Sequence, residues 1–297
     1  MRYRPGPARE LVERFHRQRP LRAGSLIITL FGDAILPRGG AVSLRSLIDL
    51  AGAFRVNERL VRTATARLAQ EGWLEARRLG KHSEYRLTEG GRERFAEATA
   101  RIYGPSTAPW SGRWTLVVLP AMPTAERQRL RKTLAWQGFG EIASGVFAHP
   151  ALHRSPLDLP TGALLFEADL ASPSSTALID LGWDLKDLAQ RYRQFADRFE
   201  RVQAELERDP DPGAAFVVRT LLIHEYRRFH LRDPLLPEAL LPAAWPGVRA
   251  EQVCRLLYGR LFGPSERHLS AVGARLEGPL PPAEQSVLRR FGGLATP

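Results

Sequence analysis

Residues 57–70 read NERLVRTATARLAQ, and their spacing predicts an amphipathic helix. The apolar side chains of this stretch recur at the spacing of one helical face: Leu60, Val61, Ala64 and Leu68. The opposite face carries arginines and threonines: Arg59, Arg62, Thr63, Thr65 and Arg67. Asn57 is expected to cap the first turn by accepting a hydrogen bond from a backbone amide. One face is therefore suited to packing and the other to phosphates and base edges, although such a helix is more often an ordinary solvated surface helix.

The segments on either side of this helix predict a winged helix-turn-helix. Residues 42–54 form a second amphipathic pattern with Ser43 as a candidate N-cap, and only two residues separate the two predicted helices. Residues 73–87 alternate like two short strands around a turn at 79–83. Basic side chains gather around that turn: Arg77, Arg78, Lys81, His82 and Arg86. In such a motif the second helix lies in the DNA major groove, and the basic hairpin would form a wing beside it.

The predicted DNA-binding domain spans residues 23–103. Its first part, residues 24–36, is strongly apolar and predicts a core helix, in which Asp33 is expected to be a cap or a surface partner rather than a catalytic group. Residues 1–22 are basic and are expected to form a polar N-terminal arm. Such an arm either follows DNA phosphates or is partly disordered.

The remainder of the chain predicts two further domains, so the expected fold class is a multidomain α+β protein. Residues 104–112 are rich in Pro, Ser and Gly and are expected to form a linker. Residues 113–171 follow a strand–helix–strand–strand–strand order, with a poor second helix near 151–158, which favours a ferredoxin-like α+β domain. Residues 172–297 predict a mainly helical effector-response domain, with a loosely held tail after residue 263.

The composition is that of a soluble globular protein with a cationic N-terminal third. The chain is 44% hydrophobic and 25% charged, and its net charge is +11. Residues 1–105 hold 20 Arg and Lys against 11 Asp and Glu, whereas residues 106–297 hold 23 against 21. This distribution is expected if the N-terminal segment meets a polyanion such as DNA.

The sequence also restricts the compartment and the chemistry of the protein. No apolar run approaches the roughly 20 residues that span a bilayer, and the N-terminus lacks the apolar core of a secretory signal. A cytoplasmic protein without membrane contact is therefore expected. Cys254 is the only cysteine, which excludes an intramolecular disulfide and a zinc site built from thiolates.

Three segments carry a resemblance to a known family. Residues 58–91 read ERLVRTATARLAQEGWLEARRLGKHSEYRLTEGG, residues 110–120 read WSGRWTLVVLP, and residues 222–247 read LIHEYRRFHLRDPLLPEALLPAAWPG. In this order they resemble the PaaX family, repressors of phenylacetic acid degradation operons. The resemblance implies an N-terminal winged helix, a middle ferredoxin-like domain related to the small CRISPR adaptation nucleases, and a C-terminal effector-response domain. It also implies a homodimer, and phenylacetyl-CoA as the ligand that releases the protein from its operator.

The residues expected to contact double-stranded DNA come from the predicted helix and wing: Arg59, Arg62, Thr63, Arg67, Arg78, Lys81 and His82. The residues expected to contact an acyl-CoA are Trp183, His224, Tyr226, Arg227 and Arg228. The two arginines would hold phosphates, and aromatic side chains, with Phe229 as a further candidate, would enclose the aryl ring. An alternative is that His224 and Arg227 only tie their helix to the turn at 233–237 by buried hydrogen bonds.

Two other classes of function are weighed against a repressor. A divalent-metal nuclease would use the ferredoxin-like domain, but Pro120 follows TLVVL where the related nucleases carry an aspartate. Hydrolysis there is not expected, and the domain is expected to serve as a scaffold or in dimerisation. A DNA-binding scaffold without a ligand response is the other alternative. The chain is expected not to be an enzyme and to need no resident metal or cofactor.

Overall fold

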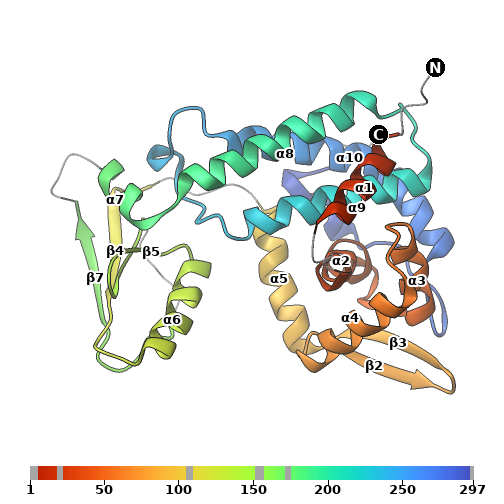
Figure 1. Ribbon diagram of the computed structural model, residues 1–297, viewed down its shortest axis with the longest axis horizontal. Coiled ribbons are helices and arrows are strands. Elements are labelled where there is room, and N and C mark those ends of the chain that lie inside the picture. Colours follow the sequence, from red (N-terminus) through yellow and green to blue (C-terminus); the bar gives the residue numbers. More distant parts are fainter. Residues whose placement is uncertain (1–5, 19–22, 105–109, 151–156, 171–174, 295–297) are drawn as a thin grey trace. The chain divides into compact units, whose positions relative to one another are not determined.

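The structure is a computed structural model that describes residues 6–18, 23–104, 110–150, 157–170 and 175–294. It is a mixed α and β protein (Figure 1). Contacts between Cα atoms divide the chain into two compact units, which are described separately. Unit 1 comprises residues 1–104, 195–228 and 250–297, and unit 2 comprises residues 105–194 and 229–249.

The N-terminal part of unit 1 contains helices and a small sheet. Its elements are α1 (Pro7–Arg17), α2 (Ala23–Leu30), η1 (Phe31–Ile35), η2 (Leu36–Arg38), β1 (Ala41–Ser43), α3 (Leu44–Gly52), α4 (Glu58–Gln70), β2 (Leu74–Leu79), β3 (His82–Leu87) and α5 (Glu89–Tyr103). The strands form an antiparallel sheet in the order β1-β3-β2. Helix α4 packs against α2, α3 and β2, so the two helices and the hairpin form one body.

The C-terminal half of the chain returns to complete unit 1. Three long helices contribute to it in part: α8 (Leu185–Glu205), α9 (Pro212–His230) and α10 (Pro246–Val272). They are followed by the short antiparallel hairpin β8 (Ala274–Arg275) and β9 (Gly278–Pro279), and by η4 (Gln285–Gly292). Unit 1 is therefore built from both ends of the sequence.

Unit 2 contains a four-stranded antiparallel sheet. Its elements are β4 (Arg113–Val118), α6 (Thr124–Trp136), β5 (Gly140–Ala143), β6 (Val146–His149), β7 (Leu164–Asp169), α7 (Ser175–Gly182) and η3 (Glu238–Leu240). The sheet order is β5-β6-β4-β7, and the succession of elements is the predicted strand–helix–strand–strand–strand. A small core joins α6 to the sheet through Val117, Leu134, Phe139 and Phe147. Most of the predicted second helix near 151–158 lies outside the described residues.

Two expectations about the ends of the chain are wrong. The predicted polar arm contains helix α1, whose Leu11, Val12 and Phe15 are buried, because its apolar positions fall on one helical face. The tail after residue 263 is not loosely held. It continues α10 to Val272, and its Leu280, Val287, Arg290 and Phe291 are buried.

The contacts also group the helical segment differently from the predicted domains. Residues 195–228 and 250–297 belong to unit 1, together with residues 1–104. The predicted boundaries at 172–297 relied on helical periodicity, which identifies helices but carries no information about which core each helix joins.

Candidate nucleic-acid interface

The turn between α3 and α4 is built by capping residues at both helix starts. The Ser43 hydroxyl accepts a hydrogen bond from the Ser46 amide at 3.2 Å, and the Asn57 side chain accepts one from the Leu60 amide at 2.9 Å. Between the helices, Arg55 adopts a left-handed backbone conformation with φ of 54°. These local interactions fix where α4 begins.

Helix α4 presents one packed face and one exposed face. The packed face consists of Val61, Ala64, Thr65 and Leu68. The exposed face carries all four predicted DNA contacts: Arg59, Arg62, Thr63 and Arg67. Thr65 was placed on the outer face by its spacing, but its hydroxyl donates to backbone carbonyls of the same helix and is buried.

Two of the exposed arginines are paired with carboxylates one helical turn away. The Arg62 Nη2 atom lies 2.6 Å from a Glu58 carboxylate oxygen, and the Arg67 Nε atom lies 3.4 Å from Glu71. Both pairs are more than 45% exposed, so each is worth less than about 1 kcal/mol and is easily exchanged. Arg59 forms no ion pair with the described residues, and its guanidinium is available to a ligand.

The β2–β3 hairpin carries the other predicted contacts. Gly80, with φ of 59°, allows the two-residue connection between Leu79 and His82. Arg78, Lys81 and His82 are exposed at this end of the hairpin. The arginines lower in the hairpin are instead paired: Arg77 with Glu277, and Arg86 with Glu75.

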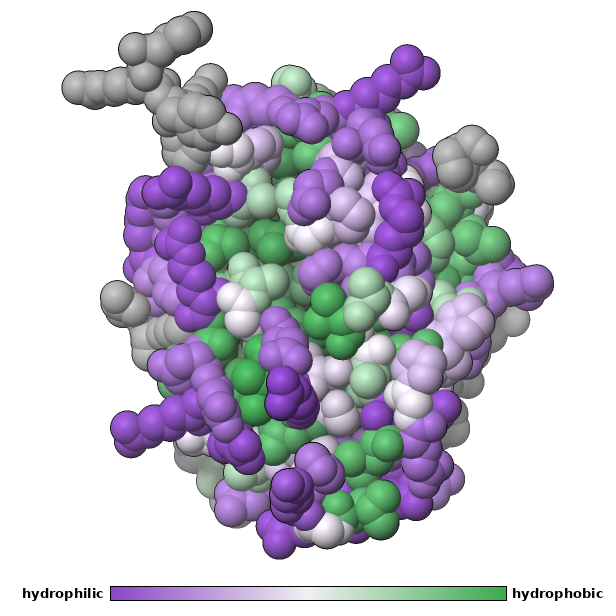
Figure 2. Space-filling model, turned by 90° about the vertical axis from the view of Figure 1, so that its right-hand side faces the viewer, coloured by the Kyte–Doolittle hydropathy of each residue, from purple (hydrophilic) through white to green (hydrophobic). Residues whose placement is uncertain are grey.

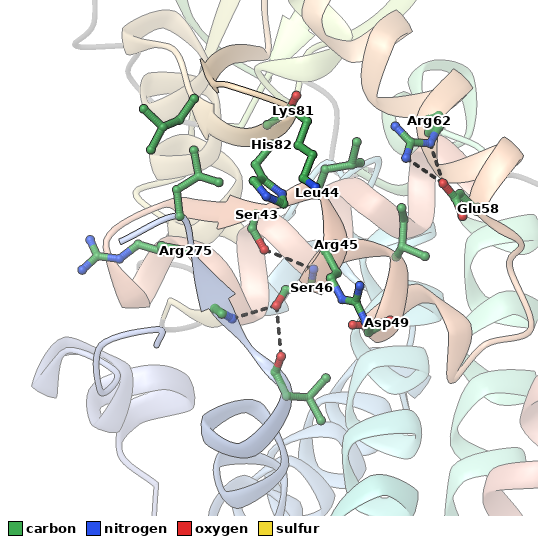
Figure 3. A pocket seen from close by; sticks show the side chains of 16 residues that line it. Ser43, Leu44, Arg45, Ser46, Asp49, Glu58, Arg62, Lys81, His82 and Arg275 are labelled. Atoms are coloured by element: carbon green, nitrogen blue, oxygen red, sulfur yellow. Dashed lines mark hydrogen bonds and ion pairs between the residues drawn. The ribbon is translucent and has the colours of Figure 1, made fainter. Parts of the chain in front are cut away.

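The hairpin, α3 and the C-terminal hairpin β8–β9 enclose a groove of about 840 Å³ (Figure 3). Its charged lining comes from four elements: Arg45, Asp49, Glu58, Arg62, Lys81, His82 and Arg275. The sequence prediction missed Arg45 and Arg275. Arg45 was detectable from its place in the first turn after Ser43. Arg275 was not, because it reaches the groove only through the return of the C-terminal chain.

The face of the molecule toward the right of Figure 1 is a polar one. Figure 2 shows hydrophilic side chains around small apolar patches on this face. No single broad apolar surface is visible there. Charged surfaces of this kind are suited to nucleic acid rather than to a hydrophobic protein partner.

Behind the helices, unit 1 contains a buried charged cluster around Asp33. This carboxylate is 3% exposed, so it is neither a cap nor a surface partner as the sequence predicted. It accepts hydrogen bonds from the hydroxyls of Tyr103 at 2.7 Å and Tyr258 at 2.8 Å. Two guanidinium groups complete the cluster: Arg219 Nε lies 3.0 Å from Asp33 Oδ2, and Arg290 Nη1 lies 2.8 Å from Oδ1.

Burial raises the pKa of Asp33, but the two arginines and the two tyrosine hydroxyls outweigh this effect, so its pKa is lowered. Burial also raises the pKa of Tyr103 and Tyr258, which keeps both hydroxyls protonated as donors. The cluster joins η1 and α5 to α9, α10 and η4. It therefore ties the N-terminal elements to the C-terminal ones.

Four of the five predicted effector contacts lie in unit 1, where they have structural partners. Arg227 donates to Thr29 Oγ1 at 2.8 Å and to both oxygens of Ser25 at 2.7 and 2.8 Å. Burial lowers the pKa of Arg227 to about 10. His224 Nδ1 lies 3.0 Å from the same Thr29 hydroxyl.

Tyr226 and Arg228 are also engaged with other parts of unit 1. Tyr226 is buried against Phe195 on α8, and Arg228 donates to Gln18 at 2.7 Å. The considered tie of α9 to the turn at 233–237 is wrong for His224 and Arg227, which join α9 to α2 instead. Their contact with an effector stays a prediction.

Trp183, the fifth predicted contact, lies in unit 2. Its indole Nε1 donates to the Gly138 carbonyl at 3.1 Å, and its ring packs near Trp114. A separate cavity of about 390 Å³ lies between α7, α8 and the segment that follows η3. Apolar side chains line much of it, including Ile179, Leu185, Leu240 and Trp245, and Lys186 and Arg193 are the cations at its wall.

The nuclease alternative finds no ligand set in unit 2. Leu119 and Pro120 follow β4 at the position where the related nucleases place an aspartate. Across the residues that the structure describes, no group of three His, Cys, Asp or Glu side chains is arranged to hold a metal ion. Nor does any helix in those residues have the length and apolar character needed to cross a bilayer.

Comparisons with known proteins identify the family. The PaaX-like protein model matches residues 22–91, the PaaX protein central Cas2-like domain matches residues 107–159, and the PaaX-like protein C-terminal domain matches residues 183–271. The transcriptional repressor PaaX of Escherichia coli (strain K12) is 35% identical over 291 residues, which cover 93% of this chain and 92% of the relative. A solved structure of an uncharacterized Mycobacterium tuberculosis protein is similar with a TM-score of 0.52 and 25% identity, over 74% of this chain and 88% of that one. The chain therefore belongs to the PaaX family of transcriptional repressors, which are not enzymes.

Proposed function

We propose that this protein represses transcription by binding double-stranded DNA through an N-terminal winged helix-turn-helix. Helix α4 would be the recognition helix, and the β2–β3 hairpin would be the wing. The single observation that carries this proposal is the division of α4 into a face locked into unit 1 and an exposed face with Arg59, Arg62 and Thr63. A helix held in this way can enter a major groove without losing its own packing.

The relative supports the same function, since its name describes a transcriptional repressor. A homodimer is part of the proposal, because two recognition helices related by a two-fold axis engage paired half-sites about one helical turn apart. The regulated genes would be those of phenylacetate-type aromatic acid catabolism, as the family resemblance implies. Access to this DNA is consistent with the expected cytoplasmic location.

The proposed signal is an aryl-acyl-CoA such as phenylacetyl-CoA. The unit 2 cavity supports it more directly than the predicted residues on α9, whose guanidinium and imidazole groups have partners on α2 and α1. An apolar wall suits an aryl group, and Lys186 and Arg193 are exposed and unpaired among the described residues. Ala244, also in the wall, has a strained φ of 56°, and strain of this kind clusters at ligand sites. The ligand releases DNA only if it binds the DNA-incompetent conformation more tightly.

Electrophoretic mobility shift on the intergenic DNA upstream of the regulated operon tests this function. Arg62→Ala is expected to weaken binding to that DNA about 5- to 100-fold more than binding to a random duplex, because a bidentate arginine–guanine contact contributes about 1–3 kcal/mol of discrimination. Equal losses on both duplexes at one salt concentration would reduce Arg62 to a backbone contact. Wild-type protein with no preference for the upstream DNA would refute the proposal.

The same assay with a panel of acyl-CoAs tests the signal. Phenylacetyl-CoA is expected to release the DNA at concentrations where acetyl-CoA and free CoA do not. Release by none of the acyl-CoAs would leave a DNA-binding scaffold as the better description.

A further inference from the structure

We propose that the groove between α3, the wing and the C-terminal hairpin binds the phosphate backbone of DNA, with Arg275 as a direct contact. The far end of the sequence would then be part of the DNA-binding surface. This inference rests on the proposed function, because it places the duplex against α4 and the wing.

The C-terminal hairpin is held beside the wing by three sets of interactions. The Ser46 hydroxyl on α3 donates to the Val272 carbonyl at 3.0 Å and accepts from the Ala274 amide at 2.9 Å. The Leu276 amide donates to the buried carboxylate of Glu84 on β3 at 2.9 Å. These bonds fix the backbone on both sides of Arg275, so its side chain starts from a defined position.

The third tie joins the hairpin to the outer strand of the wing. Arg77 Nη2 on β2 lies 2.7 Å from Glu277 Oε1, in a pair that is about half exposed on both sides. The wing therefore contacts the C-terminal hairpin through both of its strands. A hairpin that was only passing the wing would not make bonds to α3, β2 and β3 together.

The cations in the groove are the ones that the protein leaves unpaired. Arg45, Lys81 and Arg275 line the groove and are exposed, and none forms a salt bridge within the described part of the chain. The arginines of the wing outside the groove, Arg77 and Arg86, both have carboxylate partners. Unpaired guanidinium and ammonium groups keep their capacity to replace the counterions of a polyanion.

Two carboxylates also line the groove, and their positions leave the cationic path open. Glu58 is already paired with Arg62, and Asp49 lies on α3 one turn after Arg45. The start of α3 adds to the positive potential, because residues 43–46 line the groove and backbone amides at a helix N-terminus favour anions. Figure 3 shows Arg45, Arg62, His82 and Arg275 around this groove, each from a different element.

The spacing of these elements favours a long polyanion over a small one. The groove is open, has a volume of about 840 Å³, and extends from the start of α4 to the turn of the wing. A duplex with its major groove on α4 would bring one phosphate strand along this path. Contacts of this kind position a protein on DNA without reading its sequence.

Fluorescence anisotropy with the full-length protein tests the contribution of Arg275. The probes are a labelled duplex of the upstream intergenic DNA and a random duplex of the same length. Arg275→Ala is expected to weaken binding to both about five- to tenfold at roughly 0.1 M salt, and to reduce the slope of log K against log salt by about 1. Arg275→Lys should keep most of the affinity, because it keeps the charge.

Arg289→Ala is the matched control, since Arg289 is an exposed C-terminal arginine outside the groove. Equal affinity and salt slope for wild type and Arg275→Ala, or equal losses for Arg275→Ala and Arg289→Ala, would overturn the inference while leaving the repressor assignment intact. Reduced acyl-CoA affinity with unchanged DNA affinity in Arg275→Ala would overturn it too, by making the groove a ligand site. A wild-type protein that binds neither duplex would overturn the proposed function itself.

Discussion

At the scale of single residues, Asp33 is the clearest case of a side chain whose charge is needed inside the protein. A carboxylate with 3% exposure is stable there because two guanidinium groups and two hydroxyls surround it. Removing one partner from such a buried network leaves uncompensated charge, which commonly costs about 3–5 kcal/mol. The arrangement makes the stability of unit 1 depend on the ionisation of one group.

We expect Asp33→Asn to lower the free energy of unfolding by about 3–5 kcal/mol at neutral pH. Because the folded-state pKa of Asp33 is lowered, its contribution is fully present above the unfolded value near 3.9 and is lost as the pH falls through the folded value. Urea denaturation should therefore show a difference between the two proteins that narrows below about pH 4. A difference that stays constant down to the acid transition would mean that ionisation of Asp33 is unimportant. Asp49→Asn, at an exposed carboxylate of α3, is the control.

At the scale of elements, helix α4 and its neighbours are largely readable from the sequence. The spacing of residues 57–70 predicts the observed helix Glu58–Gln70, and the predicted caps Asn57 and Ser43 both accept the expected hydrogen bonds. The hairpin also turns within the predicted residues. These features depend on neighbours in sequence, and local pattern contains that information.

Other elements depend on distant residues and could not be read in the same way. Strand β1 has only three residues and forms because β3 pairs with it. Arg227 shows no sign in its own segment that its partners are Ser25 and Thr29 near the other end of the chain. The exposed face of α4 was accordingly predictable, whereas the surroundings of α9 and the groove residue Arg275 were not.

The ion pair at the start of α4 gives a prediction at this scale. Glu58→Gln should free the Arg62 guanidinium and remove one negative charge from the proposed interface, which raises affinity for a random duplex about three- to tenfold at low salt. Anisotropy titration measures this effect. Glu71→Gln makes the same charge change beside Arg67 and is the matched control. Equal gains in the two variants would show that only net charge matters.

At the scale of the whole molecule, both ends of the sequence contribute to one core. Arg290 reaches Asp33, Arg38 donates to Glu266 on α10, and the Glu284 amide donates to the Pro37 carbonyl. These bonds join residues separated by most of the chain length. Unit 1 therefore has high contact order, which slows folding because long loops must close first.

We expect a protein shortened after residue 279 to lose more than about 3 kcal/mol of stability, since it lacks Arg290 and the buried Phe291. Urea denaturation followed by tryptophan fluorescence measures the change. Arg290→Met separates the charge from the packing, and it should account for a large part of the loss. An unchanged midpoint in the shortened protein would show that the tail does not stabilise unit 1.

The meeting of both termini at Asp33 has a consequence for synthesis. A ribosome releases the N-terminal helices long before it reaches Arg290, so the early chain holds Asp33 without one of its two guanidinium partners. Fragments from aborted translation would lack the closing segment and could not compete for the operator with finished molecules. Gene control would thus pass only to chains that have been read to the end.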